Sequence, residues 1–269
     1  MKSRFTFLWA VFTPLVLALC FVILLPACAQ TTQKAANPEQ IVRVAAAADL
    51  RPVLPIFAQM YRQQTGVKLE VSFSSSSTLA TQIINGAPFD LFLAADFTFP
   101  EKVVAANLAA EPEPVPYAKG ALVLWVPKNS PLQPPTMEKL LDPAITRIAV
   151  ADEVRAPYGR AAYAAMRSMK VFEQLKPKLV VAEDISQTAQ FVQSGNAQAG
   201  FISLTLANSA PLRAAGNFAR VPNVYPDIRQ CAVVVKGSAH QKQAQAFLSW
   251  IISPYVQENL PKFGLDPIR

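Results

Sequence analysis

Glycine is scarce in this chain and widely scattered. The nine glycines among 269 residues come no closer together than Gly195 and Gly200. This spacing excludes the GxGxxG dinucleotide fingerprint and the GxSxG nucleophile motif, and no glycine precedes the Lys-Ser/Thr pair of a Walker-type loop. The common glycine-based nucleotide-binding and serine-hydrolase signatures are therefore absent.

Histidine is scarcer still, because His240 is the only one. One histidine excludes HExxH zinc sites and histidine-rich metal clusters, so we expect neither a metal site nor a cofactor. A Ser-His-Asp triad would have to use His240, which lies in the polar stretch KGSAHQKQ. A surface histidine fits that setting better than a general base does.

Clustered charge is also missing. The 25 Lys and Arg residues exceed the 18 Asp and Glu residues, giving a net charge of +7, but they form no basic run. A nucleic-acid interface usually has clustered basic residues with interleaved aromatic residues, so we expect no nucleic-acid partner. With 52% hydrophobic residues, the chain has enough apolar surface to build one large or two medium domains.

The first 29 residues have the pattern of an export signal. Lys2 and Arg4 precede an apolar run over 7–25, and Ala27-Cys28-Ala29 then supplies the small residues of a cleavage site. Two alternatives remain open. The segment 25–28 resembles a lipobox with an unusual proline, which would make Cys28 a lipid-attachment site, and the long apolar run is compatible with an uncleaved anchor. All three predict a periplasmic location.

Cleavage after this signal would leave Cys231 as the only cysteine. A single thiol forms no internal disulfide, so the fold must be stabilised by its core, and Cys231 is expected to be a small buried hydrophobe.

Beyond a polar tether at 30–40, apolar runs alternate with helical patterns. The alternation predicts a β-α-β-α-β unit, and the same order begins again after an apolar strand at 121–126. We expect an α/β protein with two lobes, a mostly parallel sheet in each and a ligand cleft between them. The predicted strands are 42–47, 67–73, 90–94, 121–126, 147–151, 178–182, 199–204 and 230–236, and the helices are 50–64, 78–84, 100–106, 136–141, 157–169, 185–193 and 241–252. The first lobe is predicted over 41–118 and 230–269, and the second over 119–229.

Four corners between a strand and a helix carry small or capping residues, at 45–50, 73–79, 155–159 and 182–187. A helix start leaves backbone N–H groups unpaired and carries partial positive charge. One such corner alone is typical of an ordinary helix cap. Several such helix starts that converge on one point would bind a compact dianion through neutral N–H and O–H donors. Each hydrogen bond to the dianion would contribute roughly 1.5–3 kcal/mol.

These corners also resemble a known family. The segments AAAADL, VSFSSSSTLATQIINGAPFDLFLAAD and LVVAEDI are similar to periplasmic molybdate-binding proteins of ABC importers. The resemblance covers most of 41–269 and is strongest over 71–96. It implies a type II periplasmic-binding-protein fold and a non-enzymatic receptor, monomeric, that captures molybdate or tungstate and delivers it to a membrane permease.

The resemblance also implies where the ligand binds. Two family serines fall at Asp49 and Ser76, two backbone amides at Tyr158 and Ile185, and a tyrosine hydroxyl at Ser203. Asp49 and Ser203 depart from the family pattern. The favoured explanation of Asp49 is that its side chain turns away and caps its own helix. The alternative is that it accepts a proton from a protonated oxyanion, which would favour a phosphate or phosphonate ligand.

Three rival functions stay open at this stage. A receptor for phosphate, phosphonate or sulfate belongs to the same class. A periplasmic hydrolase is suggested by the Asp- and Ser-rich corners, although the sequence offers no nucleophile–base pair for it. An effector-binding lobe of a regulator is disfavoured, because no DNA-binding helix pair precedes the lobes.

Overall fold

The computed structural model describes residues 40–268, which belong to one compact unit. The predicted export signal at 1–29, with Cys28, and all but the last residue of the predicted tether lie outside the described residues. Among the described residues, no helix is long and apolar enough to cross a membrane.

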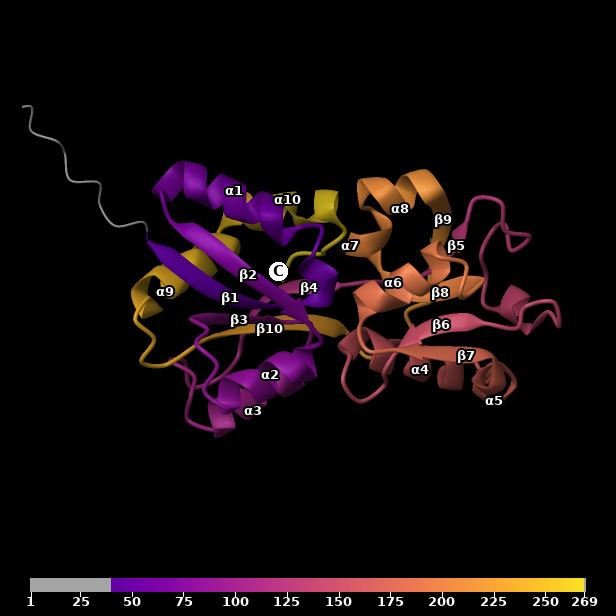
Figure 1. The fold of residues 1–269 in the computed structure, drawn as a ribbon, viewed down its shortest axis with the longest axis horizontal. Helices are drawn as coiled ribbons and strands as arrows, with labels where there is room; N and C mark the ends of the chain where they lie inside the picture. Colours follow the sequence, from indigo (N-terminus) through magenta and orange to yellow (C-terminus); the bar gives the residue numbers. More distant parts are fainter. Residues whose placement is uncertain (1–39, 269) are drawn as a thin grey trace, which may run out of the picture. The chain divides into compact units, whose positions relative to one another are not determined.

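The chain forms two five-stranded mixed sheets, flanked by helices, in two lobes (Figure 1). The two-lobed α/β fold expected from the sequence is therefore confirmed. The first sheet has the order β2-β1-β3-β10-β4, and the second has the order β7-β6-β8-β5-β9. The strands are β1 (Ile41–Ala47), β2 (Lys68–Ser74), β3 (Leu91–Ala94), β4 (Val115–Gly120), β5 (Leu122–Pro127), β6 (Ile148–Ala151), β7 (Leu179–Ala182), β8 (Ala199–Ser203), β9 (Gly216–Arg220) and β10 (Ile228–Val234).

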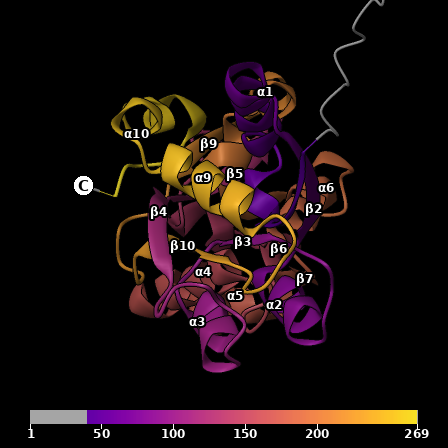
Figure 2. The same cartoon turned by 90° about the vertical axis from the view of Figure 1, so that its left-hand side faces the viewer.

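Helices cover both faces of the first sheet. Strand β1 alternates its side chains, so Val42, Val44 and Ala46 pack on one face and Ala45 on the other. Viewed from the first-lobe end, the helices lie in two groups on opposite sides of this sheet (Figure 2). One group is α1 (Leu54–Thr65), α9 (Gln241–Ile251) and α10 (Pro254–Asn259), and the other is α2 (Ser76–Ile84) and α3 (Thr98–Ala105).

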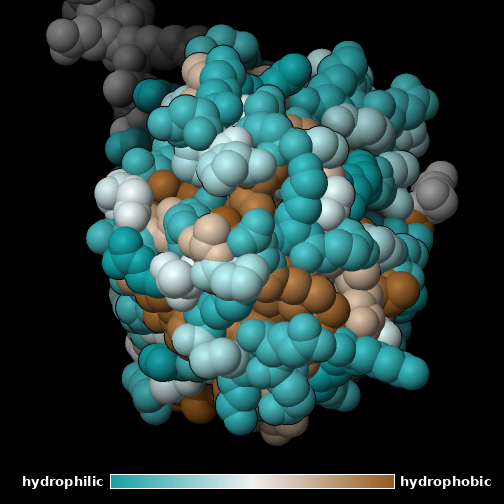
Figure 3. All heavy atoms as spheres, turned by 90° about the vertical axis from the view of Figure 1, so that its right-hand side faces the viewer, coloured by the Kyte–Doolittle hydropathy of each residue, from teal (hydrophilic) through white to brown (hydrophobic). Residues whose placement is uncertain are grey.

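The second sheet is covered in the same way and holds the larger apolar core, which includes the buried Trp125 and Phe201. In Figure 1, α4 and α5 lie near β7 at the lower edge of this sheet, α7 and α8 lie near β5 and β9 at its upper edge, and α6 lies beside β8, which it contacts. The surface at this end of the molecule is mainly hydrophilic, with small apolar areas between the polar side chains (Figure 3). The helices are α4 (Pro157–Ser168), α5 (Phe172–Leu175), α6 (Ile185–Gln193), α7 (Leu204–Ala207) and α8 (Ala210–Ala215).

The chain passes between the lobes twice. It leaves the first sheet at Gly120, the last residue of β4, and enters the second at Leu122. It returns through 221–227 to β10, which lies antiparallel to both of its neighbours. Both sheets are thus mixed, and the parallel strands β1, β2, β6 and β7 end toward the boundary between the lobes.

One helix begins later than predicted. The sequence predicts a helix over 50–64, whereas the structure has a 3-10 turn η1 (Ala48–Leu50) and then α1 from Leu54. Pro55 is the reason, because proline lacks an N–H and is tolerated in the first turn of a helix but not in its interior. The predicted helix at 136–141 is likewise a shorter 3-10 turn, η2 (Glu138–Leu141).

Candidate functional site

A small cavity lies where the two lobes meet. Its volume is about 10 Å³, which is room for about one water molecule. A tetrahedral oxyanion therefore enters only if the walls move apart. All four corners identified in the sequence contribute to its lining, and Ala95 completes it. The corner residues are Ala47, Ala48, Asp49, Ser74, Ser75, Ser76, Ala156, Pro157, Tyr158, Asp184 and Ile185.

Strand ends and helix starts position these residues. Ser75 and Asp184 are the N-caps of α2 and α6, and their side chains accept hydrogen bonds from the backbone N–H groups of Thr78 and Gln187. Both caps fix the direction in which the following helix begins. Ser76 and Ile185 follow the two caps directly, so the start of each helix faces the cavity.

Two backbone amides at the cavity have no partner among residues 40–268. Helix α4 begins with Pro157, which has no N–H, so the N–H of Tyr158 is the first of that helix. Neither this group nor the N–H of Ile185 donates to another described residue. Unpaired N–H groups at helix starts attract negative charge, and these two belong to different helices of the second lobe.

The hydroxyl of Ser76 is arranged as a donor. Its Oγ accepts a hydrogen bond from the backbone N–H of Ala95 at 3.1 Å, and its side chain is buried. No described residue accepts the hydroxyl proton of Ser76, so that proton is free to point into the cavity. The first lobe thus supplies an O–H donor opposite the two amides.

Asp49 is the charged group of the site, and it is fully buried. Its Oδ2 accepts hydrogen bonds from Tyr158 Oη at 3.1 Å and from Gln230 Nε2 at 2.5 Å, while Oδ1 has no partner. Burial raises the pKa of Asp49 from 3.8 to about 7, and the hydrogen bonds from Gln230, Tyr158 and its own backbone N–H oppose part of that rise.

The favoured sequence interpretation of Asp49 is wrong. Its side chain caps neither η1 nor α1, because the N-caps of these elements are Ala47 and Val53 and neither start has a side-chain cap hydrogen bond. The carboxyl group instead points at Tyr158 and Gln230, two donors that lie far away in the sequence. Sequence reasoning did not foresee this pair of partners.

Gly120 makes room for the contact between Tyr158 and Asp49. A Cβ atom at Gly120 would lie 2.1 Å from Tyr158 Oη, well inside any allowed contact. The absence of a side chain at this crossover residue therefore lets the phenol cross from the second lobe to the first. Tyr158 is buried, and burial beside Asp49 raises the pKa of its phenol well above 10, so it is a neutral donor.

Further contacts join the lobes around the cavity. Ser186 Oγ donates to the carbonyl oxygen of Ala48 at 3.0 Å, and Thr205 Oγ1 donates to that of Asp49 at 2.7 Å. Arg160 of α4 pairs with Asp96 of the first lobe at 3.0 Å. These contacts hold the two lobes against each other around the cavity.

Ser203 does not line the cavity, which corrects its predicted place. It is the N-cap of α7, and its Oγ accepts from the backbone N–H of Leu206. The same Oγ lies 2.7 Å from Thr205 Oγ1. Because its short side chain is engaged in this turn, Ser203 contacts the site only through Thr205. The other four predicted residues, Asp49, Ser76, Tyr158 and Ile185, line one cavity.

Sequence reasoning missed Gln230 and Thr205. Gln230 is fully buried inside the otherwise apolar part of β10, and an uncharged polar residue in such a strand was a signal that could have marked it. Thr205 sits in a short helix that the sequence pattern did not separate from β8, so no signal set it apart.

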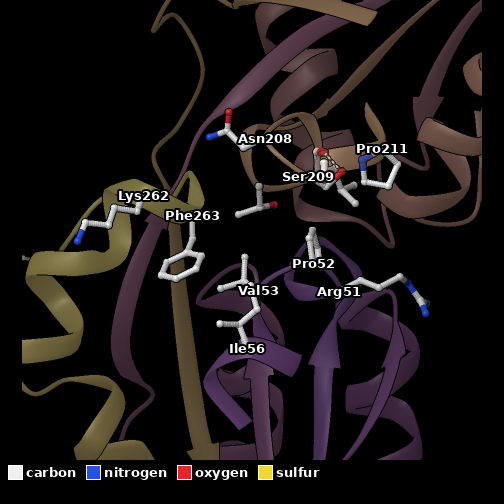
Figure 4. A pocket seen from close by; sticks show the side chains of 12 residues that line it. Arg51, Pro52, Val53, Ile56, Asn208, Ser209, Pro211, Lys262 and Phe263 are labelled. Carbon is white, nitrogen blue, oxygen red and sulfur yellow. Dashed lines mark hydrogen bonds between the residues drawn. The ribbon is translucent and has the colours of Figure 1, made fainter. Parts of the chain in front are cut away.

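A larger hollow lies elsewhere between the lobes, with a volume of about 490 Å³. Its walls are mainly apolar, with Pro52, Val53 and Ile56 on one side and Pro211 and Phe263 on others (Figure 4). The two cationic groups at its rim, those of Arg51 and Lys262, point away from its centre (Figure 4). Converging donors are lacking among these lining residues, so the small cavity is the better anion site.

The described residues offer little to a hydrolase. Between residues 40 and 268, no group of His, Cys, Asp and Glu could hold a metal ion. His240 lies 3.5 Å from Asp90 and is not among the residues that line the small cavity. Cys231 is buried, and burial raises the pKa of its thiol to about 12, so it is a poor nucleophile.

Comparison with known proteins agrees with this geometry. The family model of bacterial extracellular solute-binding proteins matches residues 42–266. The molybdate-binding protein of Rhodobacter capsulatus is 34% identical over 226 residues, which cover 84% of this chain and 87% of that protein. The molybdate-binding protein of Azotobacter vinelandii is also 34% identical over 226 residues, covering 83% of this chain and 88% of that protein.

Solved structures agree as well. The periplasmic molybdate-binding protein of Azotobacter vinelandii superposes with a TM-score of 0.78 at 29% identity, covering 85% of this chain and all of that one. The family match spans both lobes and all four corners that line the cavity. The chain therefore belongs to the family of bacterial extracellular solute-binding proteins.

Proposed function

We propose that this protein is the receptor of an ABC importer and that it captures molybdate, or tungstate, between its lobes. The observation that carries the proposal is the convergence of neutral donors from both lobes on one cavity: Ser76 Oγ–H and the N–H groups of Tyr158 and Ile185. The molybdate-binding relatives cover most of the chain and support the same ligand.

The chemistry of the donors favours a compact dianion. No Lys or Arg side chain lines the cavity, so the anion would be held by dipoles rather than by a salt bridge. Hydrogen bonds to a charged acceptor contribute roughly 1.5–3 kcal/mol each, and a tetrahedral oxyanion offers four oxygen atoms to several helix starts at once. Small lining residues, among them Ala47, Ala48 and Ala95, let an oxyanion approach the backbone.

Binding would be coupled to a hinge motion. The cavity of about 10 Å³ is too small for a tetrahedral oxyanion. The lobes would therefore open at the two crossovers to admit the ligand and settle around it, as in other hinged binding proteins. The closed form would then present the cargo to a membrane permease. The chain is a solute-binding protein and not an enzyme.

The family is extracellular by description, which supports a periplasmic location. Attachment through a lipid on Cys28 and a monomeric state are parts of the proposal that rest on the sequence.

Phosphate is the second candidate ligand, and Asp49 favours it. An ionised carboxylate can accept the proton of hydrogen phosphate, whereas molybdate and sulfate carry no proton to give near neutral pH. Calorimetric titration of the purified exported protein with molybdate, tungstate, sulfate and phosphate decides between these ligands. Tight binding of molybdate or tungstate supports the proposal. Binding of phosphate alone, lost in Asp49→Asn, would overturn the molybdate assignment.

Ser76→Ala tests the hydroxyl donor. We expect it to weaken molybdate binding by about 1–3 kcal/mol, because a charged acceptor loses one hydrogen bond. Ser77→Ala is the matched control, since Ser77 stands in the same turn and does not line the cavity. The same titration measures both variants, and equal affinities for Ser76→Ala and wild type would remove Ser76 from the site.

A further inference from the structure

Asp49 has one carboxyl oxygen that the folded protein leaves without a partner. The side chain is fully buried, and Oδ2 already accepts from Tyr158 and Gln230. Oδ1 is buried as well and has no hydrogen-bond partner among residues 40–268, although Asp49 lines the anion cavity. A buried polar atom with no partner is uncommon, and here it belongs to the wall of a site for an anion.

An ionised Oδ1 does not suit that position. Two negative charges a few ångströms apart inside a protein repel each other strongly, because little solvent lies between them to screen the interaction. A protonated Oδ1 reverses the interaction, since a carboxylic acid donates one O–H and keeps its other oxygen as an acceptor. Oδ2 would stay with Tyr158 and Gln230, and the O–H on Oδ1 would face the anion.

The neighbours of Asp49 allow the neutral form. No cationic side chain bonds to its carboxyl group: Arg51, two positions along the chain, donates to Ser186 and lies over the Phe73 ring. The phenols of Tyr158 on α4 and Tyr117 on β4 are neutral, because burial raises both of their pKa values well above 10.

The remaining titratable groups nearby are engaged elsewhere or are neutral. Asp184 caps the start of α6, and the Asp96 carboxyl pairs with Arg160. The buried thiol of Cys231 on β10 is neutral, because its pKa is raised to about 12. Burial therefore dominates the titration of Asp49, and the pKa of about 7 places its two forms in balance near neutral pH.

We infer that Asp49 is a proton-carrying donor that determines which oxyanions the site accepts. This inference rests on the proposed function. Capture of a fully deprotonated tetrahedral dianion takes up one proton from solvent, and Asp49 Oδ1 holds that proton in a hydrogen bond to an oxygen of the anion. Written as a balance, the carboxylate, one proton and the dianion give the carboxylic acid bound to the dianion. Hydrogen phosphate brings its own proton to the same hydrogen bond and requires none from solvent.

The affinity for molybdate should then depend on pH. Above the pKa of the free site, each further pH unit costs a tenfold loss of affinity, because the proton must be taken from an increasingly dilute pool. Asn at position 49 mimics the neutral acid, with its carbonyl oxygen toward Tyr158 and Gln230 and its NH₂ group toward the anion. The affinity of Asp49→Asn for molybdate should therefore lose this tenfold dependence.

Proton counting by calorimetry tests the inference. Sodium molybdate is titrated into the exported protein at pH 8.5 in two buffers of different ionisation enthalpy, and the difference gives the protons taken up per anion. We expect close to one for wild type and close to zero for Asp49→Asn. Asp90→Asn is the control, because Asp90 is a buried carboxyl of the same lobe outside the cavity lining, and it should keep a count close to one.

The possible outcomes separate a failure of this inference from a failure of the proposed function. Molybdate binding by wild type with a count near zero, or with an affinity that is constant from pH 7.5 to 9.5, overturns the inference and leaves the proposed function intact. Absence of molybdate binding at any pH overturns the proposed function itself. A count that stays near one in Asp49→Asn assigns the proton to another group and also overturns the inference. If that variant fails to fold, the wild-type count and its pH dependence decide alone.

Discussion

Without an anion, the Asp49→Asn protein should be more stable than wild type at pH 8.5, by roughly 2–4 kcal/mol. Removal of a site carboxyl group is expected to stabilise the fold because Asp49 is fully buried without a cationic partner. The pKa of Asp49 is raised from 3.8 to about 7 by burial, so holding it ionised costs folding free energy. Asn offers the same carbonyl acceptor without the charge.

The sign of the pH dependence follows from the raised pKa. Between pH 4 and 7 the folded protein binds more protons at Asp49 than the unfolded chain does, so stability falls as pH rises through this window. Above pH 7 the full free-energy cost of holding Asp49 ionised in the folded protein is present, and at pH 4 this cost has gone. The gain from Asp49→Asn should therefore be large at pH 8.5 and small at pH 4.

Chemical unfolding of both proteins at these two pH values measures the effect. The pair at pH 4 is the internal control, since the replacement is the same and only the charge state differs. An equal gain in stability from Asp49→Asn at both pH values would show that the gain comes from packing. A loss of stability at pH 8.5 would contradict a raised pKa for Asp49.

Gly159→Ala should weaken anion binding at least about tenfold and destabilise the second lobe. A Cβ atom at Gly159 would lie 2.4 Å from the carbonyl oxygens of Ala151 and Asp152, which are backbone atoms and cannot turn aside. The first turn of α4 must then move away from the end of β6. Overpacking of this kind costs roughly 1–3 kcal/mol or more.

The loss of binding follows from what α4 carries. Tyr158, one residue before Gly159, supplies an unpaired N–H to the cavity and the phenol that reaches Asp49. Displacing both should weaken molybdate binding at least about tenfold, given roughly 1.5–3 kcal/mol for a hydrogen bond to a charged acceptor. Calorimetry and thermal unfolding measure the two effects, with Ser168→Ala at the exposed end of α4 as the control. Wild-type affinity in Gly159→Ala would show that the start of α4 plays no part in binding.

Much of the fold could be predicted from the sequence, because the patterns that indicate strands and helices involve residues close together in the chain. Apolar runs such as 148–151 and 199–203, followed by capping residues, mark strand ends and helix starts without knowledge of distant contacts. The edge strand β9 was missed for the same reason, since Gly216–Arg220 has only two apolar side chains and no apolar run.

The candidate site was predictable only where backbone geometry decides it. Strand ends and helix starts predicted the four corners, and the resemblance to the molybdate-binding family then indicated Ser76, Tyr158 and Ile185, which line one cavity. The orientation of Asp49 depends on Gln230, 181 residues away, and on Tyr158, 109 residues away. Local patterns contain no information about such partners, which is why a cap was expected for Asp49. The expectation of a ligand donor at Ser203 came from the resemblance alone.

Crystals of the exported protein grown with molybdate give the most direct test of the central claim, that uncharged donors of both lobes enclose a dianion. Molybdenum has a distinctive anomalous signal, which locates it without reference to the surrounding model. We predict one strong peak between the lobes, with anion oxygens within hydrogen-bonding distance of Ser76 Oγ, the N–H of Tyr158 and the N–H of Ile185. A peak only in the larger apolar hollow, or at a lysine or arginine on the surface, would contradict the account.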